Sequence, residues 1–382
     1  MIVAGGIYSE ACVAPASVAL FGSGGRAALA LTGLTPKVVL HAFQPARLAD
    51  EVYPNFEPFG VEVRLYPSTD RVHFHYLHPL ARPRISPVPL PTAAPVEVSG
   101  GEILLFGCLE GQFRATGGLV VYDPQTSVSP RPFKENGSSA NRLAVVLNRA
   151  ELAASSGKPS IDEGVQVVRE RDGADVVIVK AGPDGAYVFD AGELVGTAPA
   201  YEASAIHKVG SGDTFSAAFA FYWMKGACSP LEAARLASLH TADYVETRRP
   251  TLNPLVADRK PMVRSANRSA LVAIGRHGAS AAWLVDETLS GLWDLGVRTR
   301  LYEGKPADAF EAVEEGETLL LLDPEPPVLD ALAADPKRGS RVVVYSERLL
   351  VAQSGPARPS FKVETDLATA LYTLAWAPEE AS

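Results

Sequence analysis

The sequence predicts an α/β fold with a largely parallel sheet, because short apolar runs alternate with helical stretches along the chain. Ligands of open α/β sheets bind beyond the carboxyl ends of the strands, and here those ends carry polar residues or glycine. The candidate buried strands are ILLFGCL (103–109), LVVYDP (119–124), LAVVLN (143–148) and DVVIVKAG (175–182). A functional site is therefore expected at the carboxyl edge of this sheet.

The stretch 61–79 has a different pattern. VEVRLYP and RVHFHYLHP alternate apolar and polar residues with a period of two, which predicts a hairpin with one solvated face. We expect it to form a small β flap beside the main sheet.

The length of 382 residues suits two domains. A basic, proline-containing and aperiodic stretch predicts a linker over 256–268, between a first domain of residues 1–255 and a second of residues 269–382. In the second domain the strand-like runs ALVAIG, VRTRLYEG, TLLLLDPEP and RVVVYSE are interspersed with helical runs such as ADAFEAVEEG. This pattern predicts a small flavodoxin-like α/β domain.

Composition narrows the classes of partner. A net charge of −9 argues against general nucleic-acid binding, which favours a basic surface. No apolar run approaches the roughly 20 residues that span a bilayer, so no membrane partner is expected. The start MIVAGGIYSE lacks the features of a signal peptide, and three isolated cysteines fit a reducing compartment. We expect a cytoplasmic protein.

The stretch HKVGSGDTFSAAFAF (207–221) places two glycines and an acid before an apolar helix. A glycine-rich turn that leads into a helix leaves backbone N–H groups unpaired, and the helix dipole favours an anion there. Gly210, Ser211 and Gly212 could thus bind a phosphoryl group, and Asp213 could accept a proton from an attacking hydroxyl. The alternative from the residues alone is a helix whose first turn is capped by the aspartate.

Several further motifs, in order along the chain, resemble those of the ribokinase-like (phosphofructokinase-B type) family of carbohydrate and nucleoside kinases. GSGD resembles the family's C-terminal signature, and the resemblance covers roughly residues 1–255. The other motifs are GSGGRAALALTGL (22–34), YDPQ (122–125), LNRAEL (147–152) and VIVKAGPDGAYVF (177–189).

The resemblance implies transfer of a phosphoryl group from ATP to a hydroxyl of a sugar or nucleoside. It implies Asp213 as the base, and the amides of Gly210, Ser211 and Gly212 as the site that stabilises the transferring group. Asn148 and Glu151 would organise Mg²⁺. The nucleotide-binding candidates are Lys180, Gly182, Gly185, Lys208 and His240, although His240 could equally be a packing residue. The substrate-binding candidates are Glu10, Gly24 and Gly25.

Other interpretations stay open. The residues Arg26 to Ala28 stand where the family often has an Asn that contacts sugar hydroxyls, so a non-catalytic nucleotide or sugar sensor is an alternative. The last domain faintly resembles nucleoside 2-deoxyribosyltransferase-like domains, with Asp323 and Glu347 at strand ends, which would suit glycosidic-bond chemistry. It could instead be a packing domain, or a dimerisation domain that would make the protein a homodimer.

Overall fold

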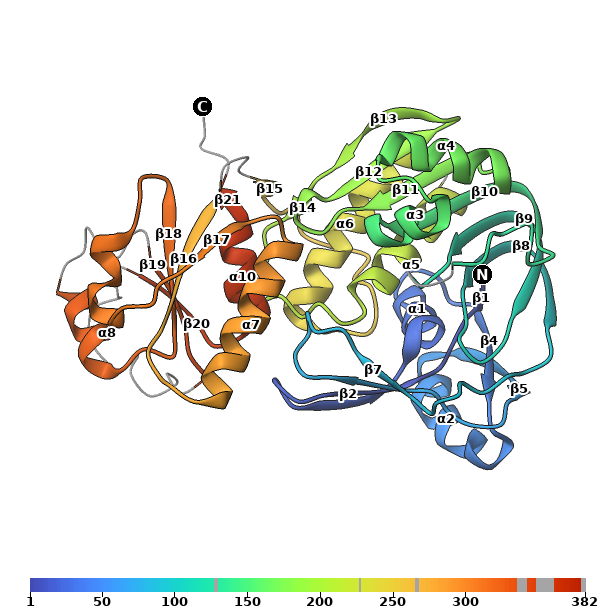
Figure 1. Ribbon diagram of the computed structural model, residues 1–382. Coiled ribbons are helices and arrows are strands. Elements are labelled where there is room, and N and C mark those ends of the chain that lie inside the picture. Colours follow the sequence, from blue (N-terminus) through green and yellow to red (C-terminus); the bar gives the residue numbers. More distant parts are fainter. Residues whose placement is uncertain (127–129, 227, 265–267, 335–341, 348–360, 379–382) are drawn as a thin grey trace. The chain divides into compact units, whose positions relative to one another are not determined.

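The structure is a computed structural model of residues 1–382, and it describes all of them except 127–129, 227, 265–267, 335–341, 348–360 and 379–382 (Figure 1). The chain packs as two compact units. The first contains Met1–Leu77, Arg82–Ala203 and Val209–Pro261. The second contains His78–Ala81, Ser204–Lys208 and Met262–Ser382.

A nine-stranded sheet forms the centre of the first unit, in the order β13-β12-β11-β10-β9-β8-β1-β4-β5. All neighbours from β11 to β5 pair in parallel, whereas β12 and β13 are antiparallel. The strands are β1 (Ile2–Ala4), β4 (Val38–Gln44), β5 (Val61–Pro67), β8 (Val96–Phe106), β9 (Phe113–Asp123), β10 (Ser139–Asn148), β11 (Val176–Lys180), β12 (Ala186–Asp190) and β13 (Glu193–Ala198). The predicted α/β class with a mostly parallel sheet is confirmed, and the four predicted buried strands lie at β8 to β11.

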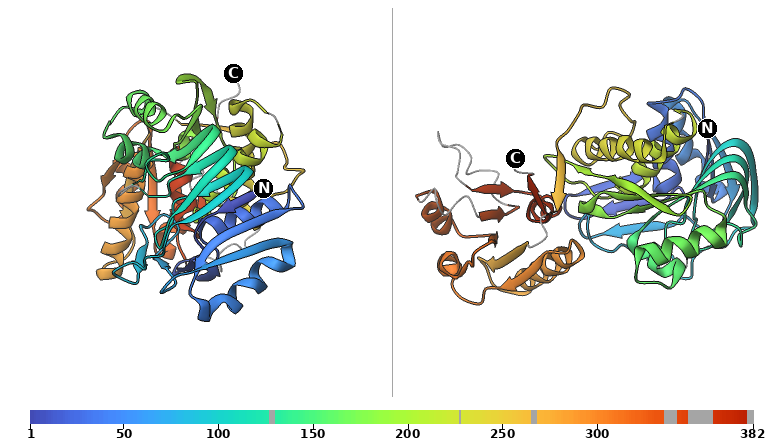
Figure 2. Two further views of the ribbon diagram at one scale, coloured as in Figure 1. Left: turned by 90° about the vertical axis from the view of Figure 1, so that its right-hand side faces the viewer. Right: turned by 90° about the horizontal axis from the view of Figure 1, so that it is seen from above.

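Helices cover both faces of this sheet (Figure 2). Successive residues of the central strands enter opposite cores: Leu104 and Val121 pack with one set of helices, and Leu105 and Val120 with the other. The first set is α1 (Gly22–Thr32), α2 (Ala49–Phe56), α5 (Ser211–Met224) and α6 (Pro230–Thr247). The second is α3 (Arg149–Ser156) and α4 (Ile161–Asp172). Burial on both faces explains why the carboxyl-terminal halves of β8 to β10 and the whole of β11 are mainly apolar.

A separate four-stranded sheet has the order β3-β2-β6-β7. Its strands are β2 (Ser9–Cys12), β3 (Ser17–Leu20), β6 (His73–Tyr76) and β7 (Arg84–Ser86). A small β flap is therefore present, but the predicted hairpin over 61–79 is wrong. Strand β5 pairs with β4 at the edge of the main sheet, and β6 pairs with β2 and β7. One face of β5 is exposed, with Glu62 and Arg64 on it, so β5 shows the same alternation as a hairpin strand.

The second unit has a five-stranded parallel sheet in the order β17-β16-β18-β19-β20. Counted along the chain this is the order 2-1-3-4-5, which confirms the predicted flavodoxin-like domain. The strands are β16 (Ser269–Ile274), β17 (Arg298–Leu301), β18 (Glu317–Leu322), β19 (Val342–Tyr345) and β20 (Lys362–Glu364). The helices are α7 (Ala279–Asp294), α8 (Pro326–Ala333) and α10 (Leu367–Ala375).

Short elements complete the described part of the chain. Residues 306–312, within a run predicted to be helical, form the 3₁₀ helix η4 (Pro306–Ala312). Strand β15 (Pro261–Arg264) lies within the stretch predicted as a linker and pairs with β21 (Trp376–Pro378). The remaining elements are η1 (Ala46–Leu48), η2 (Glu57–Phe59), η3 (Gly182–Asp184) and β14 (Ala200–Tyr201). None of the helices that the structure describes is long and apolar enough to cross a membrane.

Candidate active site

The GSGD stretch forms a turn and the first turn of α5. Gly210 precedes the helix with φ of 82°, a left-handed conformation that favours glycine. No side chain caps this helix start. The carboxylate of Asp213 instead lies in the first turn, and the residue is only 8% exposed. The predicted turn, helix start and adjacent acid therefore occur together, and the aspartate does not act as the cap.

A cavity of about 150 Å³ opens beside this turn, and we call it the inner cavity. Asp213 and Gly210 line it together with Glu10 from β2. Two aromatic residues, Tyr8 and Phe74, also contribute to its wall and stack with ring centroids 5.1 Å apart. The structure thus brings the predicted base and the predicted substrate residue Glu10 to one cavity.

Arg26 of α1 links the two carboxylates at this cavity. Its Nε lies 3.3 Å from Oδ2 of Asp213, and its Nη2 donates to Oε2 of Glu10. The guanidinium passes so close to the turn that a Cβ on Gly210 would lie 1.9 Å from Nε. Only glycine at position 210 leaves room for this buried arginine. Local sequence patterns do not reveal this role of Arg26, since the three partners come from distant parts of the chain.

The pKa of Asp213 is tuned by opposing effects. Burial raises the pKa of its carboxyl most, the charge of Arg26 lowers it, and the charges of Glu10 and Asp123 raise it. Together these effects move the pKa from 3.8 to about 6. Burial alone would lower the pKa of Arg26, but Glu10 and Asp213 raise it above its usual value. Arg26 thus stays charged, and Asp213 is deprotonated in most molecules at pH 7, as a proton acceptor must be.

Arg26→Met should move the acidic limb of the pH profile of kcat/KM to higher pH. The base works only when deprotonated. Two positive charges lower the pKa of Asp213, and that of Arg26 has a larger effect than that of Lys180. Without Arg26, more of Asp213 is protonated at pH 6, and we expect a loss of about 10-fold there relative to pH 8. The measurement is the profile of the wild type, Arg26→Met and Arg26→Lys. An unmoved acidic limb in Arg26→Met would show that Arg26 is only structural.

A second charged pair lies at the carboxyl ends of β9 and β11. Nζ of Lys180 lies 2.7 Å from Oδ2 of Asp123, which is fully buried. The hydroxyl of Ser216 in α5 donates to the same oxygen at 2.7 Å. A Cβ on Gly212 would lie 3.5 Å from this Nζ. Lys180, a predicted nucleotide-binding residue, is therefore beside the glycine amides at the start of α5, held there by Asp123.

Asn148 and Glu151, the predicted magnesium residues, form a capping box at the start of α3. The amide of Glu151 donates to Oδ1 of Asn148 at 2.9 Å, and the amide of Asn148 donates to Oε2 of Glu151 at 2.7 Å. Burial, helped by the charge of Asp123, raises the pKa of Glu151 to about 7. Across the described residues, no three His, Cys, Asp or Glu side chains gather as metal ligands. The magnesium role stays a prediction, and the capping box is a structural reason for both residues.

Two of the four predicted glycines, Gly24 and Gly185, have close backbone neighbours. Gly182 begins η3 and Gly185 directly follows it, with φ of 58° and 79°, and a Cβ on Gly185 would lie 2.0 Å from the carbonyl oxygen of Ala198. Gly24 and Gly25 lie within α1, and a Cβ on Gly24 would lie 2.5 Å from the backbone of Gly5. Neither lines the inner cavity. The substrate role of Gly24 and Gly25 stays a prediction. Their contacts give both glycines a structural role in the tight packing of α1.

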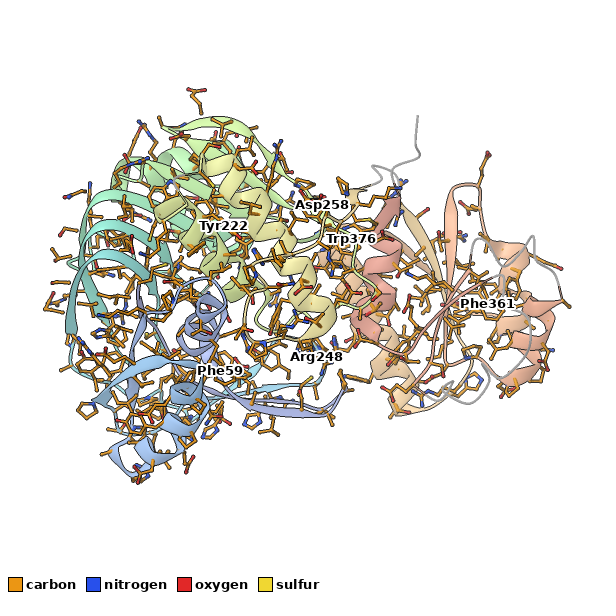
Figure 3. All side chains as sticks on the ribbon, turned by 180° about the vertical axis from the view of Figure 1, so that it is seen from behind. Phe59, Tyr222, Arg248, Asp258, Phe361 and Trp376 are labelled. Atoms are coloured by element: carbon orange, nitrogen blue, oxygen red, sulfur yellow. The ribbon has the colours of Figure 1, made fainter. Side chains whose placement is uncertain are left out.

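His240 and Lys208 complete the predicted set. His240 is buried in α6, where its Nε2 lies 2.9 Å from the hydroxyl of Tyr222 and the rings stack (Tyr222 is labelled in Figure 3). Burial lowers the pKa of His240 to about 4. These contacts favour the packing interpretation over a nucleotide contact. Lys208 packs with the second unit, and its role stays a prediction.

Comparison with known proteins agrees with the motifs. Residues 136–284 match the model of the pfkB family carbohydrate kinases. The match contains GSGD, Lys180, Asn148 and Glu151. It confirms the predicted resemblance to these carbohydrate kinases over the matched segment. No curated protein matches the sequence significantly.

Solved structures with a similar arrangement cover about two thirds of this chain. Ribokinase from Thermotoga maritima is 16% identical, with 68% of this chain and 97% of that chain covered and a TM-score of 0.48. Arabidopsis thaliana ribokinase, complexed with ribose and ATP, is 18% identical, with 68% and 95% covered and a TM-score of 0.49. Fructokinase from Vibrio cholerae, with fructose, ADP and calcium, is 14% identical, with 65% and 94% covered and a TM-score of 0.48. Because these scores lie below 0.5, the fold class rests on the sheet order above.

Proposed function

We propose that this protein is an ATP-dependent kinase that phosphorylates a hydroxyl group of a sugar or nucleoside. The observation that carries the proposal is the position of Asp213. Its buried carboxylate, with a pKa of about 6, lies at a glycine-rich helix start and lines the inner cavity. A carboxylate beside unpaired helix amides combines a proton acceptor with a site for a phosphoryl group.

The proposed reaction is an in-line transfer. The acceptor hydroxyl gives its proton to Asp213 while its oxygen bonds to the terminal phosphorus of ATP. The bond between that phosphorus and the bridging oxygen breaks, and ADP leaves with the electron pair. The amides of Gly210 to Gly212 stabilise the charge on the transferring group, and Glu10 orients the acceptor.

Lys180 and the residues near η3 support binding of the donor. The ammonium of Lys180 lies beside Gly212, where it would neutralise phosphate charge. Glu151 and Asn148 would hold Mg²⁺ through its waters, because Mg²⁺ usually keeps several waters and few protein carboxylates. When bound, the ion would neutralise negative charge on the phosphates. We place the enzyme in the cytoplasm, where Mg-ATP is plentiful.

The test is ATP consumption by the purified full-length protein against a panel of sugars and nucleosides with Mg²⁺. We expect turnover that requires one class of acceptor. Thermal stabilisation by nucleotide without turnover for any acceptor would refute the kinase and support the alternative, a non-catalytic sensor. The ion pair between Arg26 and Asp213 is the observation that favours this alternative, since it occupies the carboxylate.

A further inference from the structure

The inner cavity adjoins a larger one of about 400 Å³, which we call the outer cavity. Ile85 of β7 and the segment Gly107–Leu109, which follows β8, line both cavities. All residues that line the two cavities belong to the first unit. An acceptor bound at Asp213 can therefore extend past Ile85 into the outer cavity.

The walls of the outer cavity are mainly apolar. Leu90, Phe106, Phe113 and Tyr122 contribute to them, so aromatic rings come from two strands of the main sheet. A sugar that filled this space would place hydroxyl groups against apolar side chains without partners, which costs free energy. A flat aromatic group would instead bury apolar surface against these rings.

The polar side chains in these walls are already hydrogen-bonded. The hydroxyl of Tyr122 donates to the carbonyl oxygen of Arg131 at 2.7 Å. Gln112 donates to the carbonyl oxygen of Asn136 at 2.6 Å and accepts from the exposed Arg131 at 3.2 Å. The walls thus combine a mainly apolar surface with a few polar side chains, among them Arg131, which suits an aromatic ring with a few polar edges.

The inner cavity also has aromatic walls, but it differs from the outer cavity in carrying two carboxylates. Glu10 and Asp213 meet there, and both are carboxylates that accept hydrogen bonds from hydroxyl groups. The outer cavity is also separate from the expected donor site, since neither Lys180, Gly182 nor Gly185 lines it. The two cavities therefore distinguish two ends of one acceptor molecule.

We propose that the acceptor is a two-part molecule of the nucleoside type. Its hydroxyl-bearing ring occupies the inner cavity, with one hydroxyl toward Asp213, and its uncharged aromatic ring occupies the outer cavity. Transfer of a phosphoryl group to this acceptor rests on the proposed kinase function. Binding of the aromatic ring rests only on the outer cavity.

Matched acceptors test the proposal. Uridine and inosine carry the same sugar as free ribose and add a pyrimidine or a purine. We expect at least one of them to give a kcat/KM about 10-fold or more above that of ribose, because the aromatic ring adds contacts in the outer cavity. Binding of each compound to the full-length protein without ATP is measured by calorimetry.

A variant assigns the effect to the outer cavity. Ile85→Trp narrows the junction between the cavities and should lower the nucleoside-to-ribose ratio of kcat/KM, and of affinity, at least about 10-fold. The matched control is Val18→Trp in β3 of the same small sheet, where Val18 is 83% exposed and lines neither cavity. It should leave the ratio unchanged.

The outcomes separate the two proposals. ATP consumption with equal kcat/KM for ribose and both nucleosides would overturn the two-part acceptor and leave the kinase standing. Nucleoside binding that Ile85→Trp weakens, without ATP consumption, would overturn the kinase and leave the cavity assignment standing. Absence of nucleoside binding would also overturn the two-part acceptor.

Discussion

Asp213→Asn is expected to lower kcat by about 10²- to 10⁴-fold, the usual contribution of a positioned general base. The amide of Asn has nearly the shape of the carboxylate but cannot take the proton of the acceptor hydroxyl. Since Asp213 lies at the inner cavity and the donor is expected near Lys180 and η3, the affinity for ATP should change little. The measurement is kcat with the best acceptor, with ATP binding followed separately.

A matched control comes from the same protein. Asp162 also lies in the first turn of a helix, α4, but its side chain is exposed. Asp162→Asn should leave kcat within about two-fold of the wild type, as surface substitutions usually change little. Turnover by Asp213→Asn at the wild-type rate would remove Asp213 from the proposed mechanism, and Arg26 would then be paired with a structural carboxylate.

The strands of the main sheet and the start of α5 were predictable because local patterns determine them. Burial on both faces makes the carboxyl-terminal halves of β8 to β10 and the whole of β11 mainly apolar, so the positions of these segments follow from sequence. The turn at Gly210 was predictable for a similar reason, since two glycines before an apolar helix have few other uses. The second domain followed from the same alternation of strands and helices.

The contacts of the site could not be predicted from local patterns. Arg26, Glu10 and Asp213 meet because α1, β2 and α5 converge, and their separation in sequence gives no sign of it. Arg26 directly follows two glycines, and an arginine among small, apolar residues was the one available signal. The hairpin prediction failed for a related reason. The alternation in β5 indicates that one face of the strand is exposed, but it does not determine which strand pairs with β5.

The pair of Asp123 and Lys180 should contribute most to stability among the ion pairs of the site. Asp123 is fully buried and accepts from both Lys180 and Ser216. Asp123→Ala leaves a mostly buried ammonium without its partner, which typically costs about 3–5 kcal/mol of unfolding free energy. The measurement is urea unfolding monitored by hydrogen exchange of the amides in β9 to β11, which reports the stability of the first unit by itself.

A double variant separates the loss of the pair from the burial of a single charge. Asp123→Ala with Lys180→Met removes both charges, so it should be more stable than Asp123→Ala alone. The control is Asp70→Ala, which breaks the exposed pair of Asp70 with Arg47 and should cost at most about 1 kcal/mol. Equal losses for Asp123→Ala and Asp70→Ala would contradict the argument. If the double variant regains stability but binds ATP less tightly than the wild type, the charge of Lys180 serves donor binding, and Asp123 is the partner that makes burial of that charge tolerable.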